Sequence, residues 1–206
     1  IEALQKEVIR FGRISGNMLV TALNWHSKRG WIYGEDLSHE ERELDRLVQE
    51  IYSFSSRTAR KQASDEITRA VQSYSLAVRH FEDSADTSQR ITKQLAKMSE
   101  PVSEVKAFQD FEKWMIEIRS LADKLAPLVQ ESDLVEVKNL QAEFSILEDQ
   151  RGDLRQAFLD AGANKEMAST QTIVFIDLID KCRRAVHSQI RGIYDVWQIV
   201  DEFEEI

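Results

Sequence analysis

Glycine and proline are scarce in this chain, which contains only 7 Gly and 2 Pro in 206 residues. Turns between strands use these residues repeatedly, because Gly tolerates left-handed backbone and Pro pre-sets turn geometry. An all-β or α/β fold of this length needs many such turns. The scarcity of both residues favours a few long helices, so we predict an all-α, elongated, antiparallel helical bundle.

Apolar residues recur at spacings of three and four along most of the chain, as on the buried face of a helix. Leu4, Val8, Phe11 and Ile14 begin the first such series. One helix from Ser38 to residue 99 would span roughly 90 Å, so we expect a break near Ser55–Arg57. The pattern then predicts six helices, two long and four shorter, at about 1–29, 38–54, 57–99, 101–126, 134–161 and 164–206.

Several residues have the side chains that begin or end helices. Ser38 and Glu41 form a capping-box pattern, and Asp133 with Glu136 marks another capped start. Pro101 suits a first helical turn, where its missing N–H costs nothing. Pro127 should end or bend its helix, and Ala161-Gly162 should end the next one.

Composition and charge exclude several classes of protein. The formal net charge is -9, and an acidic surface repels phosphate backbones, so we expect no nucleic-acid partner. The single cysteine, Cys182, permits no intrachain disulfide, and its apolar neighbours at helical spacing indicate a buried small side chain. No apolar run reaches the roughly 18 residues of a membrane span, and no signal peptide is evident. The first residue is not Met, so we expect a fragment or processed chain from which flanking membrane segments were trimmed.

The sequence offers no constellation for catalysis. A di-iron bundle needs Glu-x-x-His pairs, but none of the four histidines has Glu three residues before it. One Cys and scattered His cannot supply a zinc site. Phosphate-binding and nucleophile motifs are also absent from the sequence. We therefore expect a protein that is not an enzyme and has no cofactor, no metal site and no catalytic residue.

Arginines beside the apolar series suggest a binding site instead. Arg10 and Arg13 share a helix face, and an antiparallel last helix would bring arginines to a similar height. Converging guanidinium groups would require an anion, and Arg binds carboxylates through two parallel hydrogen bonds. The predicted ligand-binding set is Arg10, Arg13, Asn17, Arg184, Arg191 and Tyr194. The alternative is that these arginines pair with surface acids such as Glu7, Asp86 and Asp195.

A second candidate site flanks the expected break. Arg57 and Arg60 lie there, and Arg151 and Arg155 lie on a later helix that could face them. With Thr170 of the last helix, Arg57, Arg60 and Arg151 form the second predicted set. Surface pairing is again the alternative.

One stretch resembles a known family. Residues 70–81, AVQSYSLAVRHF, contain Tyr74 and Phe81 seven apart, and a polar run follows to Ile91 and Met98. This stretch resembles a helix of the input domains of bacterial chemoreceptors and sensor histidine kinases. Six helices in about 200 residues are similar to the helical bimodular sensor domain. Arg10-Phe11-Gly12-Arg13 matches the Arg-x-x-Arg pair of members that bind dicarboxylates, but the Thr that follows an Arg by six residues in their last helix is missing here.

The resemblance implies an organisation and a function. Residues 1–206 would form a single extracytoplasmic sensor domain made of two stacked four-helix modules. The membrane-proximal module would comprise about 1–29, 78–126 and 184–206, and the membrane-distal module about 38–77 and 133–183. The resemblance also implies a periplasmic domain of an inner-membrane protein anchored at both ends, which acts as a homodimer. Its partner would be a small carboxylate, another anion or a periplasmic binding protein.

Two hypotheses follow from the sequence. In the first, a ligand binds between helices and shifts the first and last helices by an ångström or two, which relays a signal in chemotaxis or a two-component system. In the second, the chain is a cytoplasmic helical interaction or coiled-coil scaffold module with solvated arginines.

Overall fold

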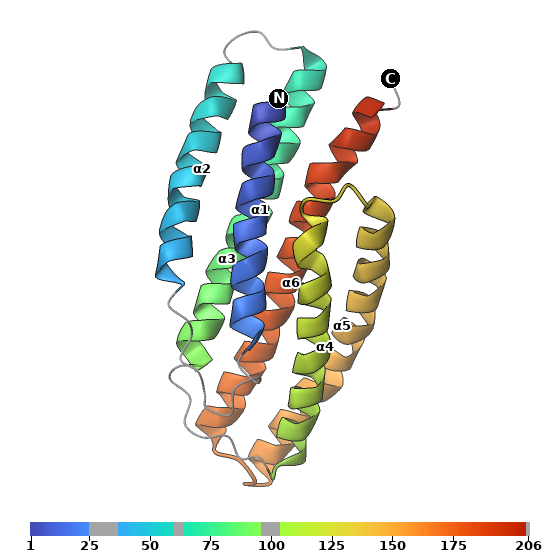
Figure 1. Ribbon diagram of the computed structural model, residues 1–206. Coiled ribbons are helices and arrows are strands. Elements are labelled where there is room, and N and C mark those ends of the chain that lie inside the picture. The colour runs from blue at the N-terminus through green and yellow to red at the C-terminus, as the bar shows by residue number, and fades with distance from the viewer. Residues whose placement is uncertain (25–36, 60–63, 96–103, 205–206) are drawn as a thin grey trace.

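The computed structural model describes residues 1–24, 37–59, 64–95 and 104–204, and for 58–59 and 199–204 it describes the backbone alone. This part of the chain contains helices and no strand, which confirms the predicted all-α class. Figure 1 shows an up-and-down antiparallel bundle. Its helices are α1 (Glu2–Leu23), α2 (Ser38–Ala59), α3 (Asp65–Leu95), α4 (Lys106–Leu128), α5 (Leu134–Ala163) and α6 (Ser169–Glu204).

Three helices form the centre of the bundle. α3 packs along α6 more extensively than any other pair, and α1 contacts both of them. α2 covers α1 and α3 on one side, while α4 and α5 pack on α6 on the other (Figure 1). Buried side chains from all six helices form one contiguous apolar core. The predicted division into two modules, with 38–77 and 133–183 in one of them, stays a prediction.

The expected division into a shorter and a longer helix is confirmed, since α2 ends at Ala59 and α3 begins at Asp65, but it lies a few residues after Ser55–Arg57. α2 continues through these residues to Ala59, and Arg57 Nε donates to the Ser53 carbonyl at 3.3 Å. α3 then begins beside Ser64, whose hydroxyl accepts from the Ile67 N–H at 3.3 Å. The apolar series falters here because Ser56 and Arg57 are exposed on α2, while the backbone of the helix continues to Ala59.

The other helix ends agree with the sequence in part. Asp133 caps α5 as predicted, since its Oδ1 accepts from the Glu136 N–H at 2.9 Å. The Glu41 N–H donates to the Leu37 carbonyl at 2.9 Å, and the Glu41 carboxylate accepts from Gln89 on α3; the capping box with Ser38 stays a prediction. Pro127 lies in the last turn of α4, which ends one residue later. The expected start at Pro101 lies outside the described residues.

Lys165, rather than Gly162, terminates α5. Its φ of 61° is left-handed, and the Glu166 N–H bonds back to the Ala161 carbonyl at 2.9 Å, as in a Schellman ending. Gly162 stays helical, and a Cβ there would lie 2.8 Å from the Thr172 hydroxyl of α6. The last helix therefore begins at Ser169 and not at Asn164.

Phe81 of α3 lies between Gly12 of α1 and Gly192 of α6. Its ring is fully buried. A Cβ on Gly12 of α1 would lie 2.6 Å from this ring, and one on Gly192 of α6 would lie 2.5 Å from it. Real Cβ atoms essentially never come this close to other atoms, so both helices need glycine at these positions. We call this arrangement the Phe81 clamp.

A buried hydrogen-bond network adjoins the clamp. The Ser15 hydroxyl contacts the Phe81 carbonyl at 2.7 Å and Gln189 Oε1 at 2.9 Å. Gln189 Nε2 donates to the Gly12 carbonyl at 3.1 Å. Ser15 and Gln189 are almost fully buried, so these bonds replace the ones lost to water. The network therefore fixes the register of α1 against both α3 and α6.

We expect Gly192→Ala to lower the free energy of unfolding by about 1–3 kcal/mol, the usual cost of forcing atoms into a packed core. The reason is that Phe81 has no room to retreat, with Gly12 on its other side. Gly152→Ala is the matched control, because a Cβ there would meet nothing within 4 Å. That change should stabilise α5 by about 0.5–1 kcal/mol. Urea unfolding of both variants checks the prediction, and equal midpoints would contradict it.

Candidate functional site

The first predicted set begins on α1, where its members lie at the surface. Arg10 Nη2 lies 2.5 Å from Glu43 Oε1 of α2, and Arg10 Nη1 lies 3.7 Å from Glu7. Arg13 and Asn17 are exposed. Arg10 thus already has carboxylate partners. One of them is Glu7, which the alternative of surface ion pairs had named.

On α6 the predicted residues face other partners. Arg184 donates from Nε to Asp83 Oδ2 of α3 at 3.0 Å and from Nη2 to Asp83 Oδ1. Ser188 adds a bond to Asp83 Oδ2 at 2.7 Å. Burial opposes ionisation of Asp83, but the bonds from Arg184 and Ser188 outweigh it and hold the Asp83 pKa below its usual value. Arg191 is exposed and Tyr194 is half-buried.

The six residues therefore do not surround one cavity. Arg10 pairs with α2 and Arg184 pairs with α3. Neither of the two cavities described below is lined by any of the six. Arg10, Arg13 and Asn17 would need to exchange partners, or act from the surface, to hold an anion together with α6.

The second predicted set is also divided. Arg151 and Arg155 both pair with Asp180 of α6, at 3.4 and 2.5 Å. Thr170 is exposed at the start of α6, and Arg60 lies outside the described residues. Arg57 is on α2, which packs mainly on α1 and α3 rather than on α5. Of the described members of this set, Arg57 lines one of the two cavities described here.

That cavity is an open groove between α1 and α2. We call it the α1–α2 groove, and its volume is about 510 Å³, within the range of small-molecule sites. Ala3 and the half-buried Phe54 contribute apolar surface, while the lining residues Leu4 and Ile51 are buried in the core. Glu7, Arg46 and Arg57 are its charged residues together with Glu50. The sequence identified Arg57, but nothing in the apolar series indicated that α1 and α2 would separate here.

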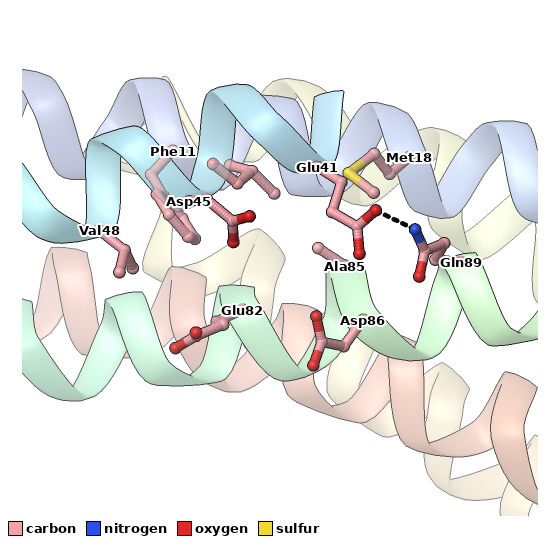
Figure 2. Close-up of a pocket in the computed structure, with 10 residues that line it drawn as sticks. Phe11, Met18, Glu41, Asp45, Val48, Glu82, Ala85, Asp86 and Gln89 are labelled. Carbon is pink, nitrogen blue, oxygen red and sulfur yellow. Dashed lines mark hydrogen bonds between the residues drawn. The ribbon is translucent and has the colours of Figure 1, made fainter. Parts of the chain in front are cut away.

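A second cavity lies between α2 and α3 and is acidic. Figure 2 shows the carboxylates of Asp45, Glu82 and Asp86 turned toward it, with Glu41 hydrogen-bonded to Gln89 beside them. Burial and the neighbouring carboxylates of Asp86 and Asp45 raise the pKa of Glu82. The cavity volume is only about 10 Å³, close to the space of one water molecule. It is too small for an organic ligand.

The described residues contain no group of three or more His, Cys, Asp or Glu side chains placed to hold a metal ion. Cys182 is fully buried, and burial raises the pKa of its thiol, so it is not an activated nucleophile. None of the helices within the described ranges is long and apolar enough to cross a bilayer.

A histidine–carboxylate pair joins α3 to α6 above the clamp. His80 Nε2 lies 3.5 Å from Asp195 Oδ2. Burial raises the pKa of Asp195 to about 6, with Arg191 opposing. Burial also lowers the pKa of His80, as do Arg191 and His187, while Asp83 acts in the opposite sense. The sequence gave no sign of this pair, because its members lie 115 positions apart in the chain.

Comparison with known proteins identifies no relative: no protein-family model, curated protein or solved structure matches the chain significantly. The resemblance to helical bimodular sensors therefore rests on the residues quoted for it and stays a prediction.

We expect Asp195→Asn to change how stability depends on pH. Because the folded-state pKa of Asp195 exceeds its ordinary value of 3.8, its stabilising contribution is complete below about pH 4 and is lost as the pH rises through 6. Asn does not ionise. The variant should therefore gain up to about 3 kcal/mol relative to the wild type between pH 4 and pH 8. Urea unfolding at both pH values measures this difference, and a constant difference would refute the assignment.

Proposed function

We propose that the chain is an extracytoplasmic ligand-binding sensor domain of a bacterial transmembrane signalling receptor, either a chemoreceptor or a sensor histidine kinase. In this proposal a small organic anion binds between helices and shifts α1 relative to α6. The domain itself performs no catalysis and acts as a homodimer anchored to the inner membrane at both ends. A periplasmic binding protein is the alternative partner.

One observation carries the proposal. The start of α1 and the end of α6 lie at the same end of the bundle (Figure 1), and the two helices contact each other directly. A domain set between two membrane-spanning segments requires this arrangement. The Phe81 clamp and the Ser15–Gln189 network join α1 to α6 without flexible chain between them. A change in the position of one helix is therefore transmitted to the other.

The runner-up function is a cytoplasmic interaction or scaffold module. It is favoured by Val135 and Ile146 of α5, which are 69% and 61% exposed. They lie eleven residues apart, so they project from the same face of the helix. A helical partner could cover that face.

We expect at least one compound from a panel of small carboxylates, amino acids and inorganic anions to raise the melting temperature. A ligand at 100 times its Kd adds about 2.7 kcal/mol, which moves the midpoint of a domain of this size by several degrees. If the anion site is the first predicted set, Arg10→Ala and Arg13→Ala will each abolish the shift. If no compound of the panel raises the melting temperature, the scaffold module is favoured.

Transmission is tested by the distance between α1 and α6. Nitroxide labels would be placed at Glu2 and Gln198, which are exposed and lie near the start of α1 and the end of α6. Pulsed electron resonance would measure the distance between the two labels with and without the binding compound. Cys182 is buried and should stay unlabelled. The distance should change by about 1–2 Å, and a ligand that leaves it unchanged would exclude a helix-shift sensor.

A further inference from the structure

The charged side chains that line the α1–α2 groove differ in the partners that they have. Arg46 lies 3.8 Å from Glu50 one turn away. Glu7 has one oxygen buried 3.7 Å from Arg10. Arg57 donates Nε to the Ser53 carbonyl, and within the described ranges no carboxylate pairs with it. With respect to the described residues, the two terminal amino groups of Arg57 are therefore placed to receive a carboxylate from a ligand.

The surface beside Arg57 is apolar. Phe54 lies one turn before Arg57 on α2 and is half-buried against the core, next to the buried Ile51 and to Leu4 of α1. Leu4 and Ile51 are buried, so a ligand that placed one carboxylate on Arg57 could lay an apolar body along Phe54 and the exposed Ala3 of α1. Small-molecule sites commonly combine an apolar lining with a few placed polar groups.

The same residues disfavour other ligands. A second carboxylate on the ligand would be set either on Phe54, where an unpaired charge is costly, or near Glu7 and Glu50, which repel it. A cationic head is repelled by Arg57, and the carboxylates of Glu7 and Glu50 already lie 3.7 and 3.8 Å from Arg10 and Arg46. The groove therefore favours a single carboxylate at Arg57 over a second carboxylate or an amine.

We propose that the α1–α2 groove binds a monocarboxylate with an apolar body, such as an arylalkanoic or medium-chain fatty acid, with Arg57 holding the carboxylate and Ala3 and Phe54 contacting the body. This inference rests on the proposed function, for which it names the ligand class and moves the site from Arg10 and Arg13 to the first two turns of α1. Binding would draw together the two helices that form the groove.

The test is calorimetric titration of the whole chain with 4-phenylbutanoate, which keeps one carboxylate and one apolar body, alongside 4-phenylbutylamine and succinate. We expect 4-phenylbutanoate to bind and the other two to bind at least tenfold more weakly. Arg57→Gln should weaken 4-phenylbutanoate at least tenfold, and Phe54→Ala should weaken it severalfold. Arg90→Gln is the matched control, since Arg90 is an exposed arginine of α3 that pairs with Asp86 outside the groove; it should change nothing.

The outcomes separate this inference from the proposed function. The groove site is overturned if Arg57→Gln binds 4-phenylbutanoate as tightly as the wild type, if 4-phenylbutanoate does not bind, or if succinate binds more tightly. In each case, another panel compound that shifts α1 against α6 would still support a sensor. Arg57-dependent binding of 4-phenylbutanoate without any change in the α1–α6 distance upholds the groove and overturns the sensor. Circular dichroism and the ligand-free melting temperature show that each variant is folded.

Discussion

The contact of Phe81 with two glycines sets the geometry of the whole bundle. α3 can pack along α6 and α1 at this distance only because Gly12 and Gly192 present no side chain to the ring. Glycine within a helix lowers stability by about 1 kcal/mol relative to Ala. Each of these glycines therefore destabilises its own helix but allows that helix to pack closely against α3. The Ser15–Gln189 network is possible for the same reason, since its hydrogen bonds reach across helices that the glycines have drawn together. α2, α4 and α5 then pack around this centre.

Ion pairs between helices tie the outer surface to that centre. Arg10 connects α1 to α2, Arg184 connects α6 to α3, and Arg183 connects α6 to Glu148 of α5 at 2.5 Å. Exposed pairs of this kind each contribute about 0–1 kcal/mol to stability. Their main effect is therefore on which helix faces pack together, and their contribution to the total stability is small. Arginine spacing alone does not separate such pairs from a binding site. Five of the described arginines pair with a carboxylate on a neighbouring helix, namely Arg10, Arg151, Arg155, Arg183 and Arg184.

The sequence was sufficient for the fold class and insufficient for the site. Apolar spacing predicts all six helices, because each one buries a single face, and Asp133 marks its helix start through a local hydrogen bond. The end of α2 and the left-handed Lys165 were missed because backbone hydrogen bonds, and not apolar content, decide where a helix stops. The partners of Arg10 and Arg184 lie 33 and 101 residues away, a distance over which periodicity gives no information. The groove depends on how α1 and α2 are placed relative to each other, which a local pattern of residues does not predict.

The groove and the clamp lie on the same rigid element. Leu4 and Glu7 line the groove, and Gly12 and Ser15 contact Phe81 and Gln189 one to two turns further along α1. An unbroken helix cannot absorb a displacement over so short a distance, because its internal hydrogen bonds resist bending. Movement of α1 toward a ligand in the groove must therefore alter the clamp or carry α6 with it. Because Gly12 and Gly192 leave Phe81 no free space, the second outcome costs less. A core packed this tightly has few intermediate arrangements, and this is the property that would convert a small shift at the groove into a movement of the last helix.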